Sequence, residues 1–286
     1  MTSSLERLLP KGSAERRTAL LIGVFLALRL AVSAVFPLIA DEAYAVVVSR
    51  FPTLSYFDHP PLGFGFARAA AWLFGSEASF IVRLPYVLMG SVSAWLLFLV
   101  TRRAFGSEAG FWAVAWYSVA PFFFISASHF VVPDGPLGFF LLLTLWLVLP
   151  GLLEDRGPDT GRWLLAGLAL GAALLSKYTA VLFGAAAFIV LLATPRGRKA
   201  LAGPGPWAAL AVAALCLTPV LLWNLQNDWA SFGFQSNRAY GGGLNVGNLL
   251  AVQLGQAGYL LPWTWAIALY MIVRGLFAPR DPAEPI

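Results

Sequence analysis

Long apolar runs, separated by short polar segments, dominate the chain. A helix that crosses a bilayer needs about 20 mostly apolar residues, and the stretches that are almost free of Asp, Glu, Lys and Arg meet that need. Apolar and polar positions do not alternate in them, as they would in the strands of a membrane barrel. The pattern therefore predicts an all-α polytopic transmembrane bundle. Its eight predicted spans are Thr18–Ala40, Leu84–Thr101, Ala109–Pro133, Gly135–Leu153, Trp163–Ser176, Tyr178–Pro195, Ala200–Asn227 and Leu249–Val273.

Between the first two spans lies a long segment, 41–83, that carries a further short amphipathic pattern. Apolar residues recur at helical spacing over Pro61–Leu73, which at about 13 residues is too short to cross the bilayer. A proline pair precedes this stretch, and proline favours the first turn of a helix. We therefore expect a juxtamembrane helix that lies on the membrane surface.

Composition agrees with a membrane location. The 286 residues are 59% hydrophobic and 12% charged, with a mean hydropathy of +0.75, whereas soluble domains carry about 25% charged residues. The single cysteine, Cys216, lies in an apolar run, so no internal disulfide can form. The first apolar run is too long for a cleavable signal peptide.

The distribution of Lys and Arg predicts the orientation. Of the 19 basic residues, 13 fall on one side of the predicted spans and 5 on the other, with Arg29 inside the first span. Basic residues concentrate on the cytoplasmic side, which places the N-terminus in the cytoplasm and segment 41–83 outside an inner (plasma) membrane. A single transmembrane domain, 1–286, would then have a cytoplasmic tail at 1–17 and a polar tail at 275–286. The net charge of +5 is explained by lipid contact, without nucleic acid.

Polar residues that are costly near hydrocarbon gather on the predicted outward side. Ionisable groups at such depth are usually paired or functional. Carboxylates, imidazoles and cations together suit transfer from a lipid phosphate, which needs a base and an anion-binding group. The candidates are Asp41, Glu42, Tyr44, Asp58, His59, Arg83, His129, Asp134, Lys177, Tyr178 and Arg238.

Five ordered segments resemble the GT-C membrane glycosyltransferases, close to the bacterial relatives of dolichyl-phosphate-mannose–protein mannosyltransferases and of aminoarabinose transferases. They are DEAY at 41–44, YFDHPPL at 56–62, RLPYVL at 83–88, VVPD at 131–134 and LLSKYTAVL at 174–182. The resemblance implies inverting transfer of a sugar from a polyprenyl-phosphate donor to an extracytoplasmic glycan, lipid or protein. Family members are usually longer, so the chain is either a compact member or a fragment.

The resemblance also implies roles for individual residues. Asp41 would be the general base, with Glu42 and Asp134 also assigned to catalysis. Lys177 and Arg238 would bind the lipid phosphate, with Arg83 as a further candidate, while Tyr44, Asp58, His59 and Tyr178 would contact substrate. Some relatives bind a divalent metal near the second acidic motif, and the candidate ligands are Asp58, His59 and His129.

Each candidate also has a purely structural interpretation. The acidic residues could cap or end helices, the cations could contact lipid headgroups, and His129 could be a packed interface residue. Arg29 could pair with a buried carboxylate such as Asp134, or form the floor of the site.

The sequence also leaves a transporter or lipid flippase open, as well as an inactive remnant, because charges within membrane helices serve transport equally well. The crowding of polar residues on one side favours the transferase. No nucleotide-binding glycine motif occurs in the chain.

Overall fold

The computed structural model describes residues 12–153, 159–240 and 245–277, and every regular element in these ranges is helical. The predicted tails, 1–17 and 275–286, fall largely outside the described residues. The helices are α1 (Ser13–Val35), α2 (Ala40–Ser49), α3 (Leu62–Phe74), α4 (Ser79–Phe105), α5 (Ser107–Val119), the π-helix η1 (Phe122–Ser126), α6 (Asp134–Leu153), α7 (Thr160–Ser176), α8 (Ala180–Ala193), α9 (Pro195–Leu201), α10 (Gly205–Cys216), α11 (Thr218–Gln226), α12 (Ala230–Tyr240), α13 (Val246–Leu260) and α14 (Pro262–Phe277).

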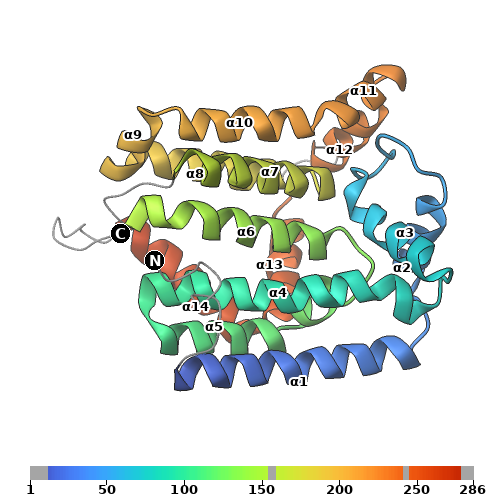
Figure 1. Cartoon of the computed structure of the whole chain (residues 1–286), viewed down its shortest axis with the longest axis horizontal. Coiled ribbons are helices and arrows are strands. Elements are labelled where there is room, and N and C mark those ends of the chain that lie inside the picture. The colour runs from blue at the N-terminus through green and yellow to red at the C-terminus, as the bar shows by residue number, and fades with distance from the viewer. Residues whose placement is uncertain (1–11, 154–158, 241–244, 278–286) are drawn as a thin grey trace.

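The long helices run side by side along the length of the molecule (Figure 1). Helix α4 packs against α1, α5 and α6, and α7 packs between α6 and α10. Small residues allow the close approaches. A Cβ atom on Gly167 would stand 2.3 Å from the carbonyl oxygen of Ala209, so α7 and α10 touch through backbone.

The number of predicted spans is only partly supported. Within the described residues, four helices are long and apolar enough to cross a membrane: α1, α4, α6 and the α10–α11 pair, Gly205–Gln226. The α8–α9 pair, bent by 107°, would make a fifth. The prediction of about eight spans is not confirmed, because breaks at Pro121 and at Leu261–Pro262 divide two predicted spans and α7 has only 17 residues.

The short helix predicted within segment 41–83 is confirmed as α3, at Leu62–Phe74. One face of α3 is buried through Phe64 and Ala67, which pack with Val82 and Tyr86 of α4. Its other side exposes Trp72 and Leu73. An exposed apolar face on a helix too short to span agrees with a place on the membrane surface.

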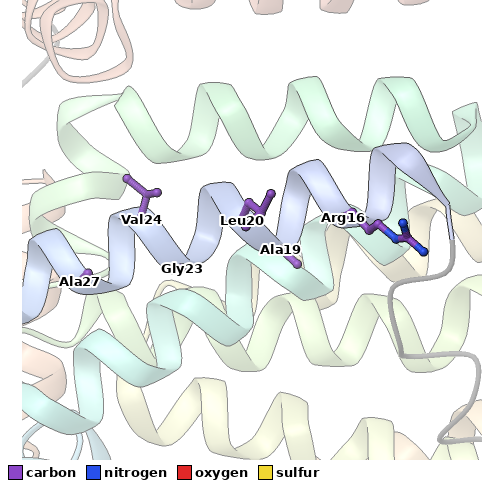
Figure 2. A pocket seen from close by; sticks show the side chains of 6 residues that line it. All are labelled: Arg16, Ala19, Leu20, Gly23, Val24 and Ala27. Atoms are coloured by element: carbon purple, nitrogen blue, oxygen red, sulfur yellow. The ribbon is translucent and has the colours of Figure 1, made fainter.

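An apolar hollow of about 680 Å³ lies along the outer face of α1. Figure 2 shows its lining side chains along this one helix, from Arg16 to Ala27. Because Leu20 and Val24 are more than half exposed and only Arg16 is polar, this surface suits lipid contact. Chemistry must therefore be sought elsewhere.

Candidate active site

A second pocket, of about 520 Å³, lies at the end of the bundle where α2, α3 and α12 gather, at the right of Figure 1. This volume is in the range of small-molecule sites. Five separate segments supply its wall: the start of α2, the segment before α3, the segment before α6, the α7–α8 junction and α12. The lining residues are Asp41, Tyr44, Asp58, His59, Phe64, Val131, Val132, Pro133, Asp134, Lys177, Tyr178, Thr179, Gln235 and Arg238.

Asp134 and Lys177 form an ion pair inside this pocket. Lys177 Nζ donates to Asp134 Oδ1 over 2.8 Å, and both side chains are largely shielded from solvent. Asp134 is the first residue of α6, where free N–H groups and the helix dipole favour a carboxylate, and Lys177 caps the C-terminus of α7, where a cation is favoured. The two helix ends thus hold the pair from opposite sides.

Asp58 and His59 form a second pair in the segment before α3. His59 Nδ1 lies 2.9 Å from Asp58 Oδ2. Burial by itself would raise the pKa of Asp58, but hydrogen bonding and charge from His59, helped by the Tyr44 hydroxyl, outweigh it and lower that pKa. Burial, with the neighbouring charge of Asp58, raises the pKa of Tyr44 to about 12. Asp58 is therefore ionised, whereas the neighbouring hydroxyl of Tyr44 keeps its proton.

Asp41 differs from the other two carboxylates of the pocket. It lies in the first turn of α2 and is exposed to the pocket. Asp134 is engaged by Lys177 and Asp58 by His59, whereas Asp41 makes no side-chain hydrogen bond or ion pair with any residue in the described part of the chain. It is the carboxylate that remains available to an incoming group.

Glu42 and Arg83 are predicted site residues that lie outside the pocket lining. Arg83 and Glu42 are 1% and 0% exposed and pair with each other, with Arg83 Nε 2.8 Å from Glu42 Oε1. Glu42 also accepts the backbone N–H groups of Ile39 and Val131, and Arg83 donates to the carbonyls of Phe36 and Pro37. The pair ties the start of α2 to α4 and to the pocket-lining segment at Val131, so it supports the wall from behind.

His129 is likewise outside the pocket lining. It is 3% exposed, and neither ring nitrogen has a hydrogen-bond partner in the described structure. Burial, with the charge of Arg83, lowers its pKa to about 4. Within residues 12–153, 159–240 and 245–277, no three His, Cys, Asp or Glu side chains lie close enough to hold a metal ion. The proposed ligand set of Asp58, His59 and His129 therefore does not form.

Arg29, which could have paired with Asp134, has other neighbours in the structure. Its buried guanidinium does not reach Asp134. It lies over the rings of Phe25 and Phe124 and donates weakly, over 3.4 Å, to the carbonyl of Phe124 in η1. Arg29 thus packs against the π-helix.

Comparison with known proteins decides the family. Residues 58–223, more than half of the chain, match the family described as dolichyl-phosphate-mannose-protein mannosyltransferase. The chain belongs to this family. The predicted resemblance to GT-C membrane glycosyltransferases is confirmed. The pocket-lining residues from Asp58 to Thr179 fall within the matched range, whereas Asp41, Tyr44, Gln235 and Arg238 lie outside it.

Two curated relatives carry more specific names. The chain is 31% identical over 246 residues to the lipid A galacturonosyltransferase RgtD of Rhizobium johnstonii, covering 84% of this chain and 51% of that protein. It is 29% identical over 181 residues to the undecaprenyl phosphate-alpha-4-amino-4-deoxy-L-arabinose arabinosyl transferase of Erwinia tasmaniensis, covering 60% of this chain and 31% of that protein. The chain thus spans about half the length of the first relative and a third of the second.

Solved structures of family-like proteins share the fold. ArnT from Cupriavidus metallidurans, in the apo state, aligns with a TM-score of 0.65 at 19% identity, over 93% of this chain and 52% of that one. The S. cerevisiae protein O-mannosyltransferase Pmt1-Pmt2 complex, bound to the sugar donor, aligns with a TM-score of 0.56 at 19% identity, over 82% and 36%.

Several residues of the wall had no individual role in the sequence-based prediction. Gln235 and Thr179 line the pocket beside predicted residues, and Val131–Pro133 line it before Asp134. Val131–Pro133 and Thr179 belong to the segments VVPD and LLSKYTAVL that carried the resemblance, and Gln235 belongs to the polar segment that ends at Arg238. The sequence thus located these positions but assigned them no role.

Proposed function

We propose that this membrane protein transfers a sugar from a polyprenyl-phosphate donor to an acceptor that arrives from the extracytoplasmic side. The free carboxylate of Asp41, in one pocket with the cations Lys177 and Arg238, is the observation that carries the proposal. The outward orientation rests on the asymmetry of basic residues between alternate loops. The names of the relatives, which refer to lipid A and to undecaprenyl phosphate, support the classes of acceptor and donor.

The reaction is a single displacement at the anomeric carbon. Asp41 accepts the proton of the acceptor hydroxyl or amine as that atom bonds to the anomeric carbon. The bond between the anomeric carbon and the phosphate oxygen breaks, and its electron pair leaves with the polyprenyl phosphate. Attack from the face opposite the phosphate inverts the anomeric centre.

Charge then grows on the departing phosphate. Fixed cations that face this charge stabilise the transition state more than the ground state. Asp134 holds Lys177 in place through the 2.8 Å ion pair, and Arg238 lines the same pocket from α12. No step of this proposal uses a metal ion.

The experiment is transfer by the full chain in nanodiscs, with a radiolabelled polyprenyl-phosphate sugar and lipid A as acceptor. Asp41→Asn should lower the rate about 10²- to 10⁴-fold, the usual contribution of a general base, while binding of polyprenyl phosphate persists. Glu77→Gln is the matched control, since Glu77 is an acidic residue outside the pocket, paired with Arg50. It should keep the wild-type rate.

Two results would overturn the proposal. Transfer by Asp41→Asn near the wild-type rate would show that Asp41 is not the general base. Movement of the lipid-linked sugar across the bilayer without a new glycosidic bond would instead identify a transporter or flippase.

A further inference from the structure

One face of α12 is turned toward the pocket. Ser231, Gln235 and Arg238 follow one another at spacings of four and three residues, which places them on the same side of a helix. Gln235 and Arg238 line the pocket, and Ser231 is fully buried behind it. Helix α12 therefore carries both a pocket cation and the groups that could fix its position.

Two hydrogen bonds from this face attach α12 to other parts of the site. Ser231 Oγ lies 2.8 Å from the hydroxyl of Tyr178, at the α7–α8 junction. One turn along the helix, Gln235 Nε2 donates over 2.6 Å to the backbone carbonyl of Asp58. The Tyr178 hydroxyl also lies 3.4 Å from Ser55 Oγ, so three separate segments meet at Tyr178.

Aromatic contacts support the same placement. The ring of Phe232 meets Tyr178 edge-on, with centroids 5.4 Å apart, and Phe234 packs on Phe57 at 4.8 Å. Both contacts join α12 to the segments that the hydrogen bonds reach. Hydrogen bonds and aromatic contacts therefore both hold α12 against these segments.

The two residues directly before α12 have an unusual backbone conformation. Asp228 and Trp229 have φ of 51° and 57°, a left-handed conformation that non-glycine residues rarely adopt. The fully buried Asn224 stabilises this reversal, because its carbonyl accepts the Trp229 N–H over 2.8 Å and its side chain accepts the Phe232 N–H over 3.3 Å. Strain of this kind persists only where surrounding contacts over-determine it, often at functional sites.

Arg238 itself lacks such anchoring. Its side chain is exposed and makes no ion pair with any acidic residue in the described ranges. The position of its guanidinium therefore depends on where α12 lies.

We propose that Ser231 and Gln235 are positioning residues, which hold α12 so that Arg238 stays in the pocket wall and faces the donor phosphate. This inference rests on the proposed function. It assigns to these two residues an effect on donor affinity that acts through Arg238.

The test measures two quantities for the full chain in nanodiscs: the Kd for undecaprenyl phosphate, and KM and kcat for the lipid-linked sugar. Ser231→Ala and Gln235→Met should each raise Kd about tenfold and lower kcat/KM by at least the same factor, because a displaced Arg238 also stabilises the charge that grows on the phosphate less. Ser236→Ala, at an exposed serine of the same helix, is the matched control and should change neither. If Ser231→Ala does not fold, Gln235→Met carries the test.

A double-mutant cycle separates positioning from a general loss of structure. Arg238→Gln should raise Kd by itself, and adding Ser231→Ala or Gln235→Met should then raise it less than a further twofold. Undiminished effects in the Arg238→Gln background, or unchanged Kd in both single variants, would overturn the inference while leaving the proposed function intact. A wild-type chain that does not bind undecaprenyl phosphate would overturn both.

Discussion

Replacing Glu42 by Gln tests whether this residue acts on substrate or supports the pocket wall. Its carboxylate accepts two hydrogen bonds from Arg83, at 2.8 and 2.5 Å, and one each from the backbone N–H groups of Ile39 and Val131, both at 3.1 Å. The glutamine keeps the shape but removes the charge and turns an NH₂ group toward donors. Arg83, only 1% exposed, is left as a buried cation without its counter-charge.

The expected cost follows from this burial. Removing one member of a buried pair costs about 3–5 kcal/mol, since the remaining charge stays desolvated. At about 2–4 °C per kcal/mol for chains of 150–250 residues, the melting temperature should fall by about 10 °C. Glu77→Gln removes the exposed pair with Arg50 and should cost at most about 1 kcal/mol.

The assay is thermal unfolding of the purified chain in detergent, followed by its circular dichroism, together with transfer per folded molecule. The double variant Glu42→Gln, Arg83→Met should melt above the Glu42→Gln single variant, because it removes the uncompensated cation. The reasoning fails if Glu42→Gln melts within about 2 °C of wild type and yet loses transfer, since Glu42 would then act on substrate directly.

Three further predictions concern packing, pH and the pocket cations. Gly90→Ala should lower the melting temperature, because its Cβ would stand 2.3 Å from Ser128 Cβ, whereas Gly138→Ala, with nothing within 4 Å, should leave it unchanged or raise it. Burial holds the pKa of His129 near 4, below its usual 6.5, so the unfolded chain binds a proton more readily than the folded one. The stability of the wild type should therefore fall as the pH drops from about 6.5 to 4. Melting curves at pH 7 and pH 5 should show a smaller fall for His129→Phe. Lys177→Gln should weaken binding of undecaprenyl phosphate at least about tenfold, and an unchanged Kd would remove this residue from the phosphate site.

The comparison of expectation and structure is most informative at the acidic residues. Asp41 and Glu42 are adjacent in the sequence and chemically alike, and both were assigned to catalysis. A helix turns about 100° per residue, so the two side chains leave α2 in different directions. Asp41 enters the pocket, while Glu42 enters the buried interface with α4. Which one lies in the pocket depends on the rotation of α2, and that is set by its packing.

The membrane spans were likewise predicted only in part from the sequence. Hydropathy identified the apolar segments, because helices in a bilayer must be apolar over their length. It did not locate the breaks, because isolated prolines occur both inside helices and at their ends. Pro85 lies within α4, whereas Pro121 precedes η1 and Pro262 begins α14.

The sequence by itself determined that the chain is a helical membrane protein of a known family, and that its reactive side chains lie in segments at one predicted side of the bilayer. These properties are local: they depend on runs of apolar residues, on the balance of basic residues and on short motifs. Only the tertiary structure decided which side chains share a pocket, which are paired there, and that Gln235 binds the backbone of the segment before α3. Such contacts join positions as far apart as Asp58 and Gln235, and they exist only when distant helices pack together.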